Sequence, residues 1–264
     1  MLGRLGIWID RLDKCGTWES VVKQACKSGI SWIAIKAGDA YRNNQLQSDT
    51  FVKQLDYAHK SGLEVLTWHK SRPQTWTAEV HLIQSLFKDG TNGHIVVPSV
   101  AWQGQSMEAA RFVEAIKKKV VDGFVGFSVD AAHANSYPLD QFLTDLDGFY
   151  PVLRGDLKTS IDMMTKVTSA IGKRTPGAVK PMYPVLSTRG PAELSQAMNA
   201  FDGMPISLNS WEEVQGADTN IFPFLTKLNE QGLITLDVAE EPDTTVPADQ
   251  QDEMSKAEDT SSDE

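Results

Sequence analysis

Short apolar runs alternate with segments of helical periodicity along most of the chain. The run ISWIAIK at Ile30–Lys36 is almost continuously apolar, which is typical of a strand buried on both faces of a parallel sheet. It is followed by Phe51–Lys60, where apolar residues recur at helical spacing until Gly62 ends the segment. This succession of strand and helix repeats as far as residue 231.

The alternation predicts eight strand–helix units, and such a pattern requires a parallel sheet with helical crossovers. The predicted strands are Leu5–Asp10, Ile30–Lys36, Leu63–His69, Ile95–Trp102, Phe124–Asp130, Phe149–Arg154, Val179–Ser187 and Met204–Asn209. The predicted helices are Trp18–Lys27, Phe51–Lys60, Thr77–Lys88, Met107–Val120, Leu139–Leu146, Leu157–Ile171, Ala192–Phe201 and Ile221–Gln231.

Eight units in a segment of this length match a (β/α)8 TIM barrel, and we predict one α/β domain of this kind at residues 1–238. A doubly wound open sheet is the alternative, because internal prolines weaken the sixth and seventh predicted strands.

The formal net charge of −10 is concentrated at the C-terminus. Residues 239–264 hold ten acidic residues and one basic residue, which leaves −1 for residues 1–238. The acidic segment has no periodicity and few apolar residues, so we predict a disordered tail. A barrel without a basic surplus is not expected to bind nucleic acid.

The chain has no apolar run near the roughly 20 residues that a membrane span needs. Its N-terminus is a poor secretory signal, so we expect synthesis in the cytoplasm, with virion association or release by lysis as further fates. Cys15 and Cys26 cannot form a disulfide framework and are expected to be reduced thiols.

In a TIM barrel the active face is formed by the loops at the C-terminal ends of the strands. Polar or charged residues end most of the predicted strands, and tryptophans lie on or beside them. The candidates are Asp10, Lys36, Asp39, His69, Arg72, Asp130, Arg154 and Glu212, with Trp68, Trp102 and Trp211. Aromatic rings beside charged groups suit a glycan, because sugars present apolar faces as well as hydroxyls.

Each candidate also has a structural interpretation. Asp10 can cap the following loop, His69 can be a hydrogen-bonded core residue, and the tryptophans can serve barrel packing. Asp130 and His133 have the character of metal ligands, but no third ligand is evident and we predict neither a metal nor another cofactor.

The segments GIWID, SGISWIAIKAGDA and SGLEVLTWHKSRP lie within the first 73 residues. Together they resemble the glycoside hydrolase family 25 lysozymes. The resemblance covers residues 6–73 and implies a lysozyme-like TIM barrel. It implies that Asp10 lies on the floor of the site, that Lys36 and Asp39 match the end of the family's second strand, and that His69 matches the histidine of its third.

The chain departs from this family at the fourth strand, where the family's D-x-E motif supplies a catalytic acid. No carboxylate occurs from Ile95 to Ser106, and most glycosidases need two carboxylates. The second would have to be Asp130, with Asp39 and Glu212 as substitutes.

Two hypotheses follow. The first is a glycoside-hydrolase-like barrel that acts on cell-wall or related polysaccharide, in which Lys36, His69 and Arg154 orient hydroxyls and tryptophans stack on sugar rings. The second is a catalytically degenerate barrel kept as a carbohydrate-binding or phage or prophage virion module. Another barrel chemistry, such as a metal-dependent hydrolase, is a third and weaker hypothesis. The oligomeric state is not predicted.

Overall fold

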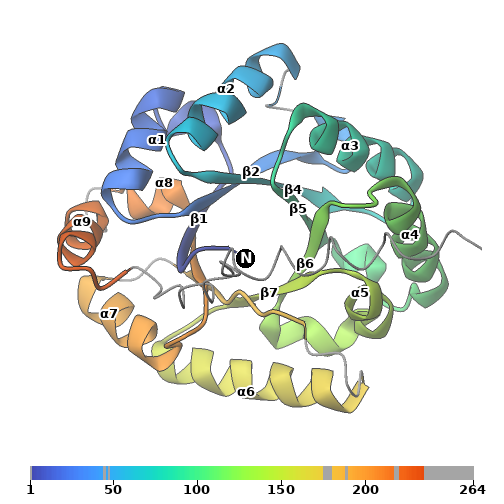
Figure 1. The fold of residues 1–264 in the computed structure, drawn as a ribbon. Helices are drawn as coiled ribbons and strands as arrows, with labels where there is room; N and C mark the ends of the chain where they lie inside the picture. The colour runs from blue at the N-terminus through green and yellow to red at the C-terminus, as the bar shows by residue number, and fades with distance from the viewer. Residues whose placement is uncertain are drawn as a thin grey trace, which may run out of the picture.

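Eight parallel strands form a closed barrel inside a ring of helices (Figure 1). The computed structural model describes residues 2–43, 46, 48–174, 180–187, 190–216 and 220–234. Strand β1 pairs with β2 on one side and with β9 on the other, which closes the sheet and confirms the predicted TIM barrel. The tail predicted at residues 239–264 lies outside the described residues.

The barrel strands are β1 (Leu5–Ile9), β2 (Trp32–Asp39), β4 (Glu64–Ser71), β5 (Gly93–Pro98), β6 (Phe124–Asp130), β7 (Gly148–Leu153), β8 (Val185–Ser187) and β9 (Ile206–Asn209). The two-residue strand β3 (Arg42–Asn43) pairs antiparallel with the end of β2. The order β1-β9-β8-β7-β6-β5-β4-β2 follows the chain round the barrel, as right-handed crossovers between neighbouring strands require.

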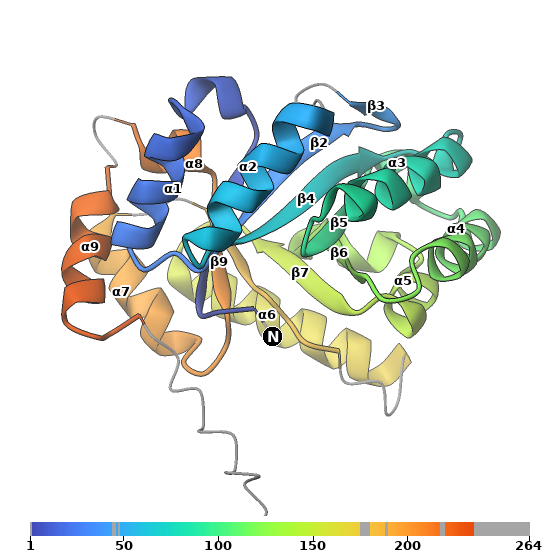
Figure 2. The same cartoon turned by 45° about the horizontal axis from the view of Figure 1, so that its top comes forward.

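The surrounding helices are α1 (Trp18–Lys27), α2 (Ser48–Lys60), α3 (Trp76–Asp89), α4 (Ser106–Lys119), α5 (Leu139–Asp145), α6 (Leu157–Arg174), α7 (Pro191–Ala200), α8 (Trp211–Val214) and α9 (Phe222–Glu230). Short 3-10 helices lie at Leu12–Lys14, Val100–Trp102 and Ala131–Ser136. Figure 2 shows the helices leaning against the outside of the strands. None of the described helices is long and apolar enough to cross a membrane.

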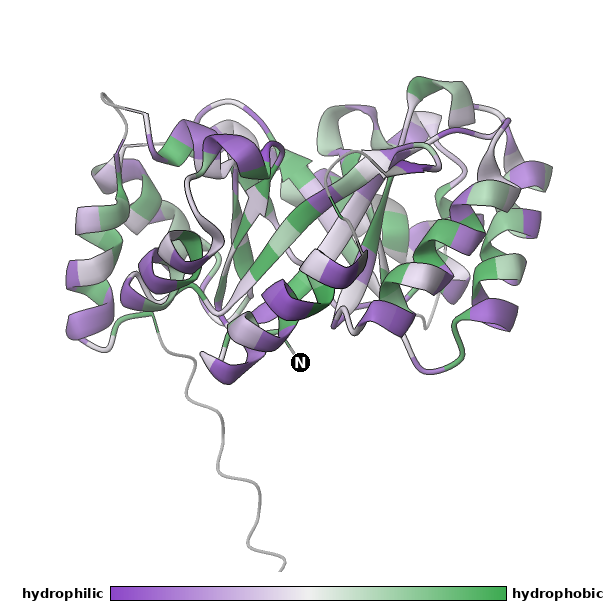
Figure 3. Cartoon of the chain, turned by 90° about the horizontal axis from the view of Figure 1, so that it is seen from above, coloured by the Kyte–Doolittle hydropathy of each residue, from purple (hydrophilic) through white to green (hydrophobic). Residues whose placement is uncertain are grey.

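Two separate hydrophobic clusters lie on the two faces of the barrel wall. The inner cluster fills the barrel and includes Trp8, Trp32, Trp68, Tyr150 and Tyr183. The outer cluster, between strands and helices, is larger and mostly aliphatic and phenylalanine side chains. Hydrophilic residues gather on the outer surfaces of the helices (Figure 3). The barrel interior is therefore a packed core.

Two predicted strands were too long at the positions of their prolines. The strand predicted at Ile95–Trp102 ends at Pro98, and Val100–Trp102 is a 3-10 helix. The strand predicted at Val179–Ser187 is reduced, within the described residues, to Val185–Ser187, preceded by an isolated bridge at Met182. Proline has no N–H to give to the ladder, which explains both differences.

The inner cluster leaves no room for a side chain at Gly6 on β1, because a Cβ atom there would overlap the indole ring of Trp32. We expect Gly6→Ala to lower the free energy of unfolding by about 1–3 kcal/mol, through overpacking. Gly172→Ala on α6 is the matched control: a Cβ atom at that position would meet no described atom within 4 Å, and alanine favours helix by about 0.5–1 kcal/mol. Denaturant unfolding of both variants measures this, and equal stabilities would contradict it.

Candidate functional site

Strand alternation selects which polar residues point into the barrel mouth. Trp8 on β1 and Ala34 on β2 belong to the inner cluster, so Asp10 and Lys36, two positions further along, also face inward. Phe124 on β6 and Val152 on β7 pack against the same cluster, which gives Asp130 and Arg154 the same orientation. Three of these residues, Asp10, Asp130 and Arg154, stand at the C-terminal ends of their strands, and Lys36 lies three residues before the end of β2. The structure brings these four predicted residues to one end of the barrel.

Asp10 follows β1 and is tied to the opposite end of the chain by Glu212, which lies in the first turn of α8. One carboxylate oxygen of Glu212 accepts hydrogen bonds from the backbone N–H groups of Asp10, at 3.1 Å, and of Arg11. Its other oxygen is buried and has no hydrogen-bond partner among the described residues. Glu212 therefore holds the backbone of the β1–α1 turn that carries Asp10.

The surroundings of Asp10 favour its protonated form. Burial of the carboxyl group raises the pKa of Asp10 above its usual value, and the negative charge of Glu212 raises it further. Lys36 acts in the opposite direction, and Glu213 adds a smaller increase. A carboxyl group whose pKa is raised by one charged neighbour and lowered by another is typical of functional sites as well as of structural ion clusters.

Lys36 and Trp68 form a platform beside Asp10. Lys36 Nζ lies 5.1 Å from the centre of the Trp68 ring, a cation–π contact. The indole of Trp68 packs against Trp8, with 5.6 Å between ring centres, and donates a hydrogen bond to Ile9 O at 3.3 Å. These contacts fix the ring at the floor of the mouth.

A cavity of about 730 Å³ opens next to this platform. Asp10 and Lys36 line it from the strands, and Trp18 and Gln54 line it from α1 and α2. This volume is in the range of small-molecule sites. The cavity can hold a ligand in contact with the Asp10 carboxyl group.

Asp130 stands at the end of β6 and is held by two neighbours. Arg154 Nε donates to one carboxylate oxygen at 2.8 Å, and the other oxygen accepts from the backbone N–H of Ala132 at 3.0 Å. His133 Nδ1 lies 3.9 Å from the same carboxylate. No group of three potential metal ligands occurs in the described part of the chain.

Asp39 and Arg72 meet at the rim, where the guanidinium of Arg72 lies 3.9 Å from Asp39 Oδ1. Both side chains are substantially exposed, at 43% and 54%, so this contact is a weak one in free energy. The pair links the ends of β2 and β4 above the platform.

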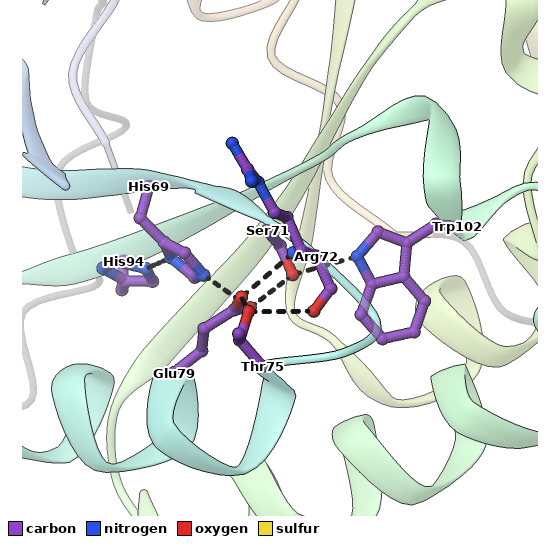
Figure 4. A network of polar contacts seen from close by, with 7 residues as sticks. All are labelled: His69, Ser71, Arg72, Thr75, Glu79, His94 and Trp102. Atoms are coloured by element: carbon purple, nitrogen blue, oxygen red, sulfur yellow. Dashed lines mark hydrogen bonds and ion pairs between the residues drawn. The ribbon is translucent and has the colours of Figure 1, made fainter. Parts of the chain in front are cut away.

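His69 lies on the opposite face of β4 from Trp68 and does not reach the mouth. Its side chain is fully buried between the barrel wall and α3, where Nε2 lies 3.0 Å from Glu79 Oε2 (Figure 4). Trp102 and Trp211, predicted to contact a glycan, are buried in the outer cluster. We assign these three residues to packing and hydrogen bonding behind the barrel wall.

Glu79 and His94, which the sequence patterns did not single out, complete a buried polar network around His69. His94 Nε2 lies 2.7 Å from His69 Nδ1, and Thr67 Oγ1 lies 2.8 Å from His94 Nδ1. Both histidines and Glu79 have 0% exposure. The available signal was alternation: Thr67 and His69 share a face of β4, and Trp68 takes the other.

No protein-family model matches this sequence, and no curated protein matches it. Solved structures resemble the fold at low identity. The active domain of a chitinase from Pyrococcus furiosus has a TM-score of 0.62 and 10% identity, over 78% of this chain and 82% of that one. A family 18 chitinase from Crocus vernus has a TM-score of 0.58 and 11% identity, over 85% and 98%.

A monomeric variant of dihydrodipicolinate synthase also matches, with a TM-score of 0.52 and 11% identity over 92% of this chain and 84% of that one. These likenesses establish the TIM-barrel fold alone.

The buried network makes stability depend on pH. Burial lowers the pKa of His94 well below 6.5, and the nearby His69 lowers it further, so the unfolded chain binds more protons than the folded one below about pH 6.5. Burial acts to raise the pKa of Glu79, but hydrogen bonds from His69, Ser71 and Thr75 outweigh it and lower the pKa overall. Both shifts predict that the free energy of unfolding falls as pH falls.

Glu79→Gln is expected to lower the free energy of unfolding at pH 7 by about 2–5 kcal/mol, because it removes a buried charge on which several donors converge. Below the pKa of folded Glu79 the variant and the wild type should approach each other. Denaturant unfolding between pH 2 and 8 measures both effects. Glu114→Gln, an exposed partner of Lys118, should change stability by less than about 0.5 kcal/mol. An equal loss in both variants would contradict the assignment.

Proposed function

We propose that this protein is a glycoside-hydrolase-like barrel that cleaves a polysaccharide, with Asp10 as the proton donor. The observation that carries the proposal is the position of Asp10: it lines the 730 Å³ cavity at the barrel mouth, with a raised pKa. In most glycosidase families, hydrolysis uses a carboxylic acid that remains protonated and a second carboxylate that remains ionised.

Asp130 is the proposed second carboxylate. Strands β1 and β6 are four strands apart in either direction round the barrel, so Asp10 and Asp130 stand on opposite sides of the mouth. An eight-stranded barrel with strands about 4.8 Å apart is about 15 Å across. Inward-pointing aspartates reduce this to roughly 8–10 Å between carboxyl oxygens, close to the spacing of inverting glycosidases.

The step then follows from these positions. Asp10 gives its proton to the glycosidic oxygen as that bond breaks, while Asp130 takes a proton from a water molecule that attacks the anomeric carbon from the other side. Arg154 keeps Asp130 oriented through its 2.8 Å hydrogen bond. The products are two shorter sugar chains. Asp10 ends ionised, and Asp130 ends protonated.

Glu212 supports Asp10 and does not attack the substrate. The 3.1 Å bond between Glu212 Oε1 and Asp10 N, added to the length of the aspartate side chain, limits the two carboxyl groups to a separation of about 8 Å. At that distance its charge disfavours ionisation of Asp10. Its second carboxylate oxygen is buried, which keeps it from bulk water.

Substrate contacts are proposed for the platform of Lys36 and Trp68 and for Arg72 at the rim. Lys36 Nζ lies over the face of the Trp68 ring, and an ammonium group has three N–H donors that sugar hydroxyls can accept. The chitinase neighbours make a glycan a reasonable choice, as does the family 25 resemblance of residues 6–73. Both likenesses concern the class of substrate. The particular sugar is determined by the experiment below.

Asp10→Asn and Asp130→Asn are each expected to reduce hydrolysis by about 10²–10⁴-fold, the usual contribution of a general acid or base. Release of reducing ends from chitin and from purified bacterial cell walls measures the activity. Asp56→Asn, on the surface of α2 and paired with Lys60, is the control and should retain full activity. If the wild type binds these polysaccharides but releases no reducing ends, or if Asp10→Asn is fully active, the proposal is wrong.

Glu212→Gln preserves the shape of the side chain and its acceptor oxygen but removes the charge that raises the pKa of Asp10. Activity requires protonated Asp10, so it falls as pH rises through that pKa. The variant should therefore lose activity at lower pH than the wild type. Glu213→Gln, a smaller cause of the same shift, should move the profile less. Rates measured from pH 3 to 8 provide the comparison, and a shift to higher pH would contradict this role of Glu212.

A further inference from the structure

The buried network behind β4 and β5 has two complete hydrogen-bond patterns. In the first, both histidines are neutral, and each donor points toward Glu79. Thr67 donates to His94, His94 Nε2–H donates to His69 Nδ1, and His69 Nε2–H donates to Glu79. Every nitrogen of the two rings has a partner in this pattern.

Adding one proton reverses the donor–acceptor direction of two hydrogen bonds in this network, and no hydrogen bond is lost. His69 becomes an imidazolium that donates from Nε2 to Glu79 and from Nδ1 to His94 Nε2. His94 then donates from Nδ1 to Thr67, and the Thr67 hydroxyl turns to Gly93 O, which lies 3.4 Å away. A buried donor left unpaired costs free energy; here the threonine hydroxyl accommodates the added proton.

The charged groups near the two imidazole rings come from α3, from β4 with its turn, and from β2. Glu79 on α3 is the carboxylate that contacts the pair. Lys70 follows His69 on β4, and Arg72 comes directly after that strand. Lys36 and Asp39 lie on the neighbouring β2, where they pair with Trp68 and Lys70 of β4. On the helix side, Trp102 stacks on Phe112 of α4 at 5.5 Å, and β6 contributes Val125 and Phe127 to the outer cluster.

Glu79 connects this pair to the mouth. Its carboxylate also accepts hydrogen bonds from Ser71 Oγ, from the backbone N–H of Arg72 at 3.0 Å and from Thr75 Oγ1 at 2.7 Å. Trp102, from the loop after β5, donates to Ser71 Oγ at 3.0 Å (Figure 4). The turn that carries Arg72 is thus attached to the same carboxylate as His69.

We propose that Thr67, His94, His69 and Glu79 form a pH-sensitive switch, which stores one proton behind the barrel wall and controls how tightly the Arg72 turn is held. With neutral histidines, the charge of Glu79 is shared among the donors of the turn and one imidazole. When His69 is protonated, the imidazolium takes the larger share of that charge, and the hydrogen bonds to Ser71, Arg72 and Thr75 weaken. Acid therefore loosens the turn, whatever reaction the mouth performs.

The test is an NMR titration of the whole protein from pH 8 to 4. The ¹⁵N shifts of the His69 and His94 rings are expected to report uptake of one proton by the pair. The Arg72 amide resonance is expected to move with the same midpoint, and its hydrogen exchange to accelerate, as its bond to Glu79 weakens. A stationary Arg72 amide during that uptake, or acid unfolding before any uptake, would overturn the switch.

His69→Gln supplies the matched variant, because glutamine can donate to Glu79 and accept from His94 but holds no extra proton at these pH values. In this variant the Arg72 shift should no longer titrate. His59→Gln, at the other end of the barrel beside Asn92, should leave the Arg72 titration intact. An Arg72 titration that persists in His69→Gln would assign the proton to another group and contradict the proposal.

Discussion

In a closed barrel, each strand presents alternate side chains to the interior and to the helices, and closure leaves no edge where this alternation can relax. The pairing of β1 with both β2 and β9 imposes that constraint here. It places Trp68 in the barrel and His69 behind the wall, although the two are adjacent in sequence. The inward face of β4 contributes to the barrel mouth, and its outward face contributes to the buried network.

Much of the architecture could be predicted from periodicity. Runs such as Ile30–Lys36 are apolar because helices and interior both cover the strand, and their number and spacing match a barrel. The predicted ends of strands were less accurate where a proline occurs, as at Pro98. The position of Asp10 directly after a strand was predictable for the same reason as the strands themselves. Lys36 was predicted to end its strand, but β2 continues to Asp39.

The partners of the site residues could not be predicted, because they come from distant parts of the chain. Glu212 lies about two hundred residues from the Asp10 turn that it holds. Glu79 has the pattern of an ordinary polar residue of a surface helix, yet it is fully buried, since four donors from β4 and its turn compensate its charge. Burial of this kind depends on tertiary contacts, which the periodicity of the sequence does not reveal.

The account depends on Asp10 being a carboxylic acid with an elevated pKa at the barrel mouth. The most direct measurement is a titration of the Asp10 carboxyl carbon by NMR in ¹³C-labelled protein. The account predicts a midpoint clearly above the usual value of about 3.9 for aspartate. A midpoint at or below that value would show that Lys36 outweighs burial and Glu212, and would contradict the assignment of Asp10 as proton donor.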